Sequence, residues 1–271
     1  MAAGSAAVAR AATNSPGTAS VRMTLYHGEP NGPSLAVLAT LFAKEVQAEL
    51  VGIDLARGER HRLACAQEPQ VAMSVEGEGP VLVVEGEAMA DSVFLACYLD
   101  DIGQGVALRP ADPFARWEMM TWCRQMTERV APAAAYLGCR AYPPKADAAL
   151  LPRIASVDLR ARWEQIAAGN FSENHLSDSR TKIRQAVERI EQRLEGRQWL
   201  LGSFSIADIE SYAWLAGMVS LVPEAFAGRP RATAWLERVK AQPAIRQALS
   251  LARTADPTSA WSVGPEINRW G

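Results

Sequence analysis

The sequence contains few of the residues that build metal centres and disulfide frameworks. Its 271 residues include only four cysteines and three histidines. No two cysteines form a Cys-x-x-Cys pair and the histidines are scattered, so the sequence predicts neither a metal site nor a disulfide framework. The cysteines are expected to be free, mostly buried thiols of a cytoplasmic protein, at Cys65, Cys97, Cys123 and Cys139.

Two other absences exclude classes of partner. The net charge of −2 provides no basic field, which argues against nucleic acid as a partner. No apolar run approaches the roughly 20 residues that a membrane-spanning helix needs, so no membrane partner is expected. With 49% hydrophobic and 21% charged residues, the composition is that of a globular protein, long enough for one large domain or two of ordinary size.

The first 22 residues differ from the rest of the chain. Met1–Arg22 is rich in alanine, serine and threonine, with two arginines and no acidic residue. This composition is compatible with a transit peptide, but a strong amphipathic pattern is missing. We prefer a disordered N-terminal extension over residues 1–22, because the first predicted strand begins at Met23.

Residues 23–101 alternate between strand and helix patterns. The clearest signal is a hairpin, with an apolar run at Val81–Val84, a turn at Glu85–Gly86 and a return strand at Glu87–Met89. Asp91 and Ser92 then begin a helix. Upstream we expect a strand at Met23–Tyr26, a helix capped by Ser34, a strand at Ala48–Leu55 and a short helix at Arg57–Ala66. This order predicts an α/β domain whose mostly parallel sheet has helices on both faces.

The character of the sequence changes after Asp101. Residues 102–111 contain two glycines and a proline and are expected to form a linker. Residues 112–253 are expected to be all helical, because no strand pattern occurs beyond residue 110. The helix signals are Asp112–Pro113, apolar positions from Met119 to Val130, the segments Thr181–Gly196 and Ala232–Lys240, and a capping box at Ser205–Asp208. Residues 254–271 are an irregular C-terminal tail with two tryptophans, placed to fold over a cleft.

The order of elements in residues 23–101 resembles the glutathione-binding half of the glutathione transferases. In that family a cis-proline opens the third strand, and an acidic residue followed by serine binds the γ-glutamyl end of glutathione. The matching residues here are Pro80, Asp91 and Ser92. A helix N-terminus with free N–H groups and a hydroxyl also suits a carboxylate on physical grounds. The resemblance implies a thioredoxin-like N-terminal domain followed by an all-α domain.

Ser34 is the residue at which the resemblance places activation of the glutathione thiol. A hydroxyl at a helix N-terminus can donate to an anion, and the helix dipole favours a thiolate over a thiol. From the spacing of apolar residues alone, Ser34 would be interpreted as a helix cap without a catalytic role. The resemblance favours the catalytic interpretation, because the family places its activating residue at this point. Tyr26 and Asn31 are the other side chains nearby that can take this role, and the loop contains no cysteine.

Further glutathione contacts are implied on the second helix and the third strand. One of the cations Arg60, His61 and Arg62 is expected to pair with the glycine carboxylate of glutathione. The backbone of Gly79, which stands where the family has valine, is expected to pair with the cysteinyl part. The segment Gln70–Glu78 before it is longer than in the family, which leaves the shape of the cleft wall open.

Several stretches resemble more narrowly the bacterial β-aryl etherases, glutathione-dependent enzymes that cleave ether bonds in lignin-derived compounds. The most specific is Leu108-Arg-Pro-Ala-Asp-Pro-Phe114, and Tyr98-Leu-Asp-Asp101 and Ser205-Ile-Ala-Asp-Ile209 continue it. The resemblance implies that the glutathione thiolate attacks the carbon that bears an aryl ether beside a ketone, displacing a phenolate. It also implies a homodimer. The hydrophobic aromatic substrate is expected to meet aromatic side chains of the helical domain, for which the candidates are Trp117, Trp122, Tyr136 and Tyr142.

Two alternatives stay open at this point. One is a general glutathione transferase, lyase or dehalogenase that acts on another electrophile. The other is a non-catalytic protein of the same fold that serves as an interaction module. The second alternative predicts a disabled thiol site, although Ser34, Pro80, Asp91 and Ser92 are all present.

Overall fold

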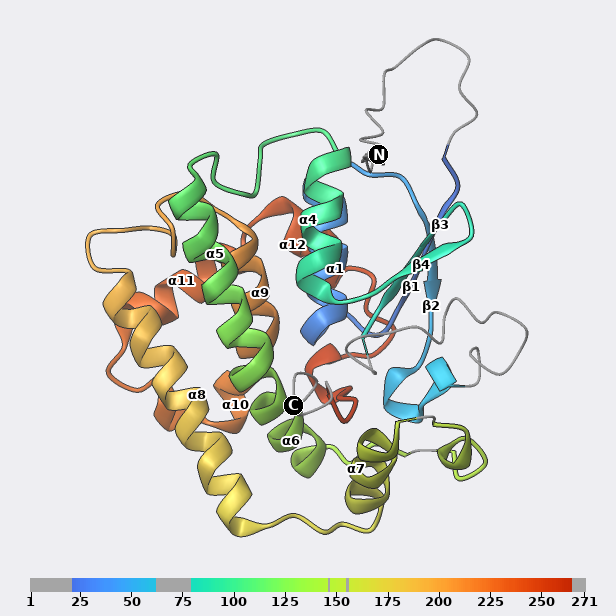
Figure 1. The fold of residues 1–271 in the computed structure, drawn as a ribbon. Helices are drawn as coiled ribbons and strands as arrows, with labels where there is room; N and C mark the ends of the chain where they lie inside the picture. Colours follow the sequence, from blue (N-terminus) through green and yellow to red (C-terminus); the bar gives the residue numbers. More distant parts are fainter. Residues whose placement is uncertain (1–20, 62–78, 146, 155, 265–271) are drawn as a thin grey trace, which may run out of the picture.

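The computed structural model describes residues 21–61, 79–145, 147–154 and 156–264, which form a small sheet with two helices beside a larger group of helices (Figure 1). The predicted extension at residues 1–22, apart from its last two residues, lies outside the described part. So do the segment Gln70–Glu78, Cys65, Arg62 and Trp270.

The sheet has four strands in the order β2-β1-β3-β4. They are β1 (Met23–His27), β2 (Glu49–Gly52), β3 (Val81–Val84) and β4 (Glu87–Met89). Only β1 and β2 run parallel, and the pairs β1–β3 and β3–β4 are antiparallel. The prediction of a mostly parallel sheet is therefore wrong. The physical reason lies in the predicted hairpin itself, since a two-residue turn can only join antiparallel strands. Glu85 and Gly86 form that turn with φ of 51° and 88°, as a type I′ turn requires.

Helix α1 (Gly32–Ala43) follows the first strand and buries the predicted positions Leu35, Leu38 and Leu41. Its N-cap is Asn31 and not Ser34, which corrects the predicted start. The helix begins earlier because Pro33, which has a fixed φ and no N–H group, fits the first helical turn without losing a hydrogen bond.

Two more elements of the α/β half begin at aspartate caps. The 3₁₀ turn η1 (Leu55–Arg57) begins after Asp54, whose carboxylate accepts from the Arg57 N–H at 3.1 Å. Helix α4 (Ser92–Ile102) begins after Asp91. The Asp91 carboxylate accepts from the N–H groups of Val93 and Phe94, at 3.0 and 3.2 Å. The predicted helix start at Asp91–Ser92 is confirmed.

The described residues beyond 110 contain helices and turns and no strand, as predicted. Asp112 caps α5 by accepting from the Ala115 N–H at 2.8 Å. The predicted segment Thr181–Gly196 belongs to a longer helix, because Ser172 caps it upstream. The helices are α5 (Pro113–Gln125), continued through the π-helical turn η2 (Met126–Val130) into α6 (Ala131–Ala141), then α7 (Val157–Ala167), α8 (Glu173–Arg193), α9 (Ile206–Leu215), α10 (Met218–Leu221), α11 (Pro230–Lys240) and α12 (Pro243–Leu249). Short 3₁₀ turns are η3 (Leu151–Arg153), η4 (Pro223–Ala225) and η5 (Pro257–Ser259).

The capping box predicted at Ser205–Asp208 is present at the start of α9. The Asp208 carboxylate is fully buried and accepts from the N–H groups of Leu200 and Ser205, the Ser205 hydroxyl and the indole of Trp235. Burial raises the pKa of Asp208 to about 6 despite these donors, among which the Leu200 N–H is foremost in lowering it. Its role is structural, because it fixes α9 against α11.

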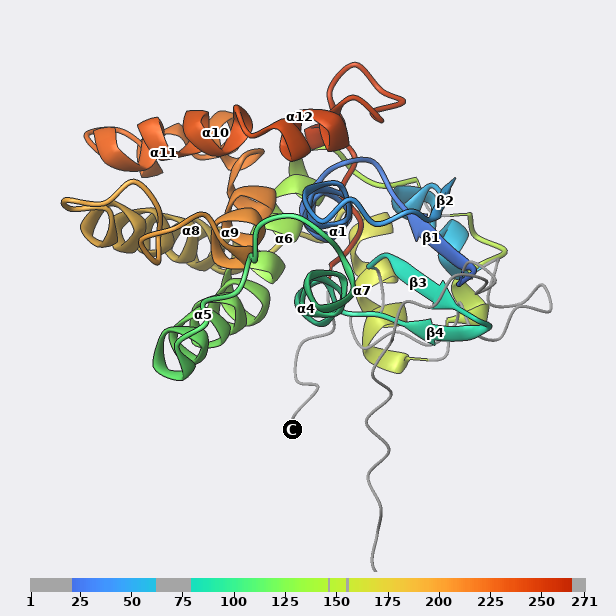
Figure 2. The same ribbon diagram turned by 90° about the horizontal axis from the view of Figure 1, so that it is seen from above.

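One hydrophobic core joins the two halves of the molecule. Helix α1 packs against α4 on the sheet side and against α9 and α12 of the helical half (Figure 2). Most of the buried apolar side chains accordingly form one cluster from Leu25 to Val263. No helix in the described ranges has the length and apolar character needed to cross a membrane.

Candidate functional site

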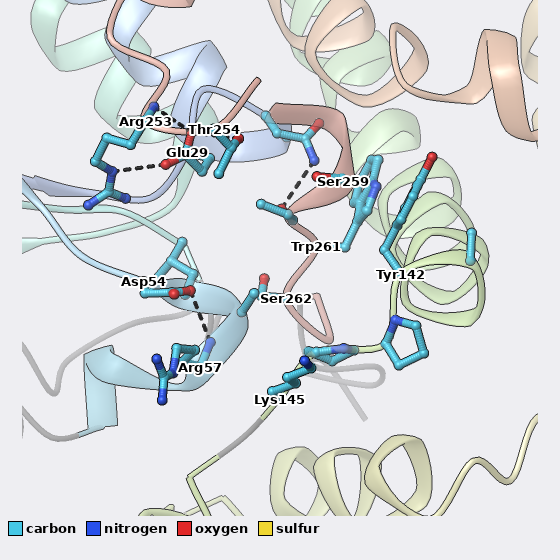
Figure 3. A pocket seen from close by; sticks show the side chains of 18 of the residues that line it. Glu29, Asp54, Arg57, Tyr142, Lys145, Arg253, Thr254, Ser259, Trp261 and Ser262 are labelled. Atoms are coloured by element: carbon cyan, nitrogen blue, oxygen red, sulfur yellow. Dashed lines mark hydrogen bonds and ion pairs between the residues drawn. The ribbon is translucent and has the colours of Figure 1, made fainter. Parts of the chain in front are cut away.

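A cleft of about 930 Å³ lies where the two halves meet. On one side it is lined by the β1–α1 loop, the start of α1 and the segment 54–57. On the other side are the end of α6 with its following loop, Trp214 of α9, and residues 253–262, here called the C-terminal strap, of which 253, 254 and 259–262 line the cleft (Figure 3). The prediction that the tail folds over a cleft therefore holds for its described part.

The β1–α1 loop is held by a buried hydrogen bond to Ser34. The Gly28 N–H donates to Ser34 Oγ at 2.9 Å, and Ser34 is only 1% exposed. His27 is buried beside it, with Nδ1 at 2.7 Å from the Gly28 carbonyl oxygen. Burial lowers the pKa of His27, so its ring is neutral near pH 7. Ser34 is not among the described residues that line the cleft.

Asn31 does line the cleft, together with Gly32 and Pro33. As the N-cap of α1 it has extended backbone angles, but its side chain makes no capping hydrogen bond. Instead its Nδ2 donates to the Ala260 carbonyl oxygen of the strap at 3.4 Å. The first N–H groups of a helix have no partner within it, and the helix dipole favours an anion there. The N-terminus of α1 is thus an anion-attracting feature in the cleft wall.

The opposite wall is aromatic. Trp214 and Trp261 stack with ring centroids 6.3 Å apart and an interplanar angle of 29°, and both line the cleft. Tyr142 stands at the end of α6 and is 37% exposed, followed by two prolines in the same wall. Aromatic side chains in the wall of a cleft suit an aromatic ligand.

The charged side chains of the cleft are mostly engaged. Glu29 binds Arg253 through both carboxylate oxygens, which accept from Nε at 2.9 Å and from the backbone N–H at 3.0 Å (Figure 3). Arg253 Nη2 also donates to the Ile53 carbonyl oxygen at 3.0 Å. These bonds attach the start of the strap to the α/β half. Arg57 and Lys145 are exposed and add two positive charges to the rim.

Comparisons with known proteins identify the family. A model of the glutathione S-transferase C-terminal domain matches residues 146–243. Protein LigF of Sphingobium sp. (strain NBRC 103272 / SYK-6) is 28% identical over 254 residues, covering 86% of this chain and 95% of LigF. The crystal structure of the beta-etherase LigF from Sphingobium sp. strain SYK-6 matches with a TM-score of 0.74 at 26% identity, covering 84% of this chain and 98% of that one. The chain belongs to the glutathione transferase superfamily.

More distant structures share the fold of this transferase. A glutathione transferase family member from Pseudomonas fluorescens Pf-5, solved with two glutathione molecules bound, has a TM-score of 0.62 at 16% identity and covers 84% of this chain and 92% of its own. The predicted architecture, a thioredoxin-like domain followed by an all-α domain, is confirmed.

Gly79, Pro80 and Arg60 line no described part of the cleft, so their predicted contacts with glutathione stay predictions. No peptide bond among the described residues is cis, so the cis-proline implied at Pro80 is not found. Trans is the form that an X–Pro bond intrinsically prefers, by about 0.5–1 kcal/mol. Arg60 is 2% exposed, and its Nη1 donates to the Gly79 carbonyl oxygen at 2.6 Å. It therefore holds the start of β3, while His61 is half-buried and lines no described part of the cleft.

Ser92 faces the helical half of the transferase. It is fully buried, and its hydroxyl donates to Glu210 Oε1 on α9 at 3.1 Å. The same oxygen accepts from the indole N–H of Trp214 at 2.8 Å. Asp91 next to it has a φ of 76° and caps α4. Neither residue lines the described cleft, so the γ-glutamyl contact of both stays a prediction.

Of the four predicted substrate aromatics, the structure brings only Tyr142 to the cleft. Trp122 is buried with its indole N–H bonded to Ser211 Oγ at 2.9 Å. The Tyr136 hydroxyl accepts from the Ser172 N–H, and its ring stacks on His175 at 3.9 Å. Trp117 is 59% exposed and packs against Phe114. None of these three residues lines the described cleft, so their contact with substrate stays a prediction.

Two residues of the aromatic wall escaped the sequence analysis as substrate contacts. Trp214 lies four residues after Glu210 on a helix whose every residue is buried, so helical spacing marks no face. Trp261 lies in the irregular tail. The one feature of the sequence that pointed to it as a ligand contact was the presence of two tryptophans outside any helix pattern. No group of histidine, cysteine and acidic side chains within the described ranges has the arrangement of a metal site.

Proposed function

We propose that this transferase cleaves β-aryl ether bonds in lignin-derived aromatic ketones with glutathione as co-substrate. The observation that carries the proposal is the similarity to the beta-etherase LigF, which spans nearly the whole of LigF and most of this chain. The cleft supports it, because an anion-attracting helix end faces an aromatic wall across one space.

The proposed reaction is a substitution at the carbon beside the ketone. The glutathione sulfur forms a bond to that carbon as the ether C–O bond breaks, and the electron pair leaves with the phenolate, which takes a proton from water. A free thiol with a pKa of about 8.5 is mostly protonated at neutral pH. The N-terminus of α1 favours the thiolate and lowers that pKa. Phenolate is a good leaving group, so no strong general acid is needed.

Asn31 and Ser34 are the proposed activating residues, with different parts. The Asn31 amide lines the cleft and can donate to a thiolate by releasing the Ala260 carbonyl oxygen, to which its bond is long at 3.4 Å. The Ser34 hydroxyl accepts from Gly28 and is buried, so it supports the loop that carries Asn31. This reverses the order expected from the sequence, in which Ser34 came first.

Incubation with glutathione and a fluorogenic β-aryl ether ketone tests the proposal, with release of the phenol as the readout. Conjugation of other electrophiles without phenol release would leave a general transferase, lyase or dehalogenase. Absence of glutathione binding in calorimetry would remove both activities and leave the interaction module.

Variants separate the two activating residues. Asn31→Ala is expected to lower kcat roughly tenfold to a hundredfold and to move the rise of the pH–rate profile to higher pH, because a donor to the thiolate is lost. Ser34→Ala leaves the buried Gly28 N–H unpaired and is expected to lower the free energy of unfolding by about 1–3 kcal/mol. Ser220→Ala, at an exposed position on α10, is the matched control. An unchanged pH profile in Asn31→Ala would move the role to Ser34 or Tyr26.

Compartment and assembly belong to the same proposal. The three described cysteines, Cys97, Cys123 and Cys139, are free, which fits a reducing cytoplasm. We also propose that the protein is a homodimer. The exposed pair Phe114 and Trp117 on α5 offers an apolar surface to which a second copy can bind.

A further inference from the structure

The C-terminal strap inserts Trp261 into a slot built from two glycines. A Cβ atom at Gly138 on α6 would lie 2.3 Å from the ring of Trp261, and one at Gly217 before α10 would lie 2.9 Å from it. A side chain at either position would therefore require the indole or the neighbouring backbone to shift. The ring is accordingly 3% exposed, although it lines the cleft.

Contacts on both sides of Trp261 fix its place. The Ala260 carbonyl oxygen accepts from Asn31 at the start of α1. The Ser262 carbonyl oxygen accepts from the Cys139 thiol at 3.3 Å. The indole is therefore held between the proposed thiolate position and α6, next to Trp214.

The two stacked indoles differ in their N–H groups. The N–H of Trp214 donates to Glu210 at 2.8 Å. The N–H of Trp261 is buried and makes no hydrogen bond within the described ranges. Buried donors are nearly always paired in folded proteins, and an unpaired one calls for an explanation. Here the unpaired donor belongs to a side chain that lines a ligand-sized cleft.

We propose that Trp261 selects the aromatic acceptor, with its ring packing against the arene and its N–H donating to the ketone oxygen. The inference rests on the proposed etherase activity and adds a residue that determines its specificity. A neutral donor among aromatic rings favours a neutral oxygen such as a ketone over a carboxylate. The indole nitrogen of Trp261 is buried in this structure, so the ligand can reach it only if the strap shifts. The contact that the strap gives up in this shift is the long hydrogen bond between Asn31 and the Ala260 carbonyl oxygen. The same shift frees the Asn31 amide for the thiolate.

Binding without glutathione tests this inference apart from turnover. The probes are 2-phenoxyacetophenone and its analogue with a methylene group in place of the ketone, titrated into the full-length protein by calorimetry. We expect the wild type to bind the ketone roughly threefold to tenfold more tightly than the analogue, the range for one hydrogen bond. Trp261→Phe keeps a ring and loses the donor, so this preference is expected to fall to about one. Trp261→Ala is expected to weaken both probes at least tenfold.

Trp199→Phe is the matched control, because Trp199 packs against Phe204 and lines no described part of the cleft. It is expected to keep the wild-type preference. A Trp261→Phe variant that still prefers the ketone would overturn the inference about Trp261. If the wild type releases phenol in the same set of experiments, the proposed etherase activity is retained. A wild type that binds neither probe and releases no phenol would overturn both.

Discussion

The close packing of Trp261 against Gly138 predicts that Gly138→Ala changes stability in opposite directions with and without the indole ring. Gly138→Ala places a methyl group 2.3–2.4 Å from three ring atoms, whereas carbon atoms pack at about 3.5–4.0 Å. The ring or α6 must move by more than about 1 Å, and such overpacking costs about 1–3 kcal/mol. Against this, alanine in a helix interior is more stable than glycine by about 1 kcal/mol. We expect Gly138→Ala to lower the free energy of unfolding by up to about 2 kcal/mol in the wild type.

Removal of the ring should reverse this effect. In a Trp261→Ala background only the helix propensity remains, so Gly138→Ala is expected to raise the free energy of unfolding by up to about 1 kcal/mol. The coupling energy between the two positions is then the overpacking cost itself, about 1–3 kcal/mol. Urea unfolding of the four proteins, followed by circular dichroism, measures it. Equal effects of Gly138→Ala in both backgrounds would refute the packing of the indole against Gly138.

Two further predictions concern the capping box and the strap. The pKa of Asp208, raised by burial from 3.8 to about 6, means that the folded state binds its proton more tightly than the unfolded state. This contribution to stability is full below about pH 4 and is lost as pH rises through about 6. The free energy of unfolding relative to Asp208→Asn should therefore fall by about 2–3 kcal/mol between pH 4 and pH 7. Urea titrations at constant ionic strength measure this difference, and a constant difference would contradict the raised pKa. Arg253→Ala removes an ion pair whose arginine side chain is 45% exposed, so the free energy of unfolding should change by less than about 1 kcal/mol while chymotrypsin cleaves the strap at Trp261 faster. A loss of several kcal/mol would show instead that the strap unfolds with the core.

Local signals in the sequence predicted most of the fold. The hairpin at Glu85–Gly86 and the caps at Asp91, Asp112 and Ser205 all appear as expected, because turns and caps depend on a few adjacent residues. Strand pairing depends on distant partners. The alternation of strands and helices therefore suggested a parallel sheet, whereas β3 pairs antiparallel with β1 across more than fifty intervening residues.

The candidate site was less predictable, since side-chain direction decides it. Tyr136 and Trp122 have the right chemistry for an aromatic substrate, yet each is turned into the helical core and hydrogen-bonded there. Trp261 has no periodic pattern around it, and its place follows from glycines at 138 and 217 that only the folded chain brings together. Spacing in the sequence contains no information of this kind.

Glu210 shows why the two halves of this transferase are not independent in function. Its buried Oε1 accepts both from Ser92, at the start of α4, and from Trp214, in the wall of the cleft. A carboxyl group held at these two distances fixes α4 relative to the aromatic wall, because separating the two elements would leave buried polar groups without hydrogen bonds. Any ligand that draws on the Ser92 hydroxyl must therefore alter a bond that also positions Trp214. The linker at residues 102–111 separates the halves along the chain, but Glu210, Asn31 and the strap join them around one cleft.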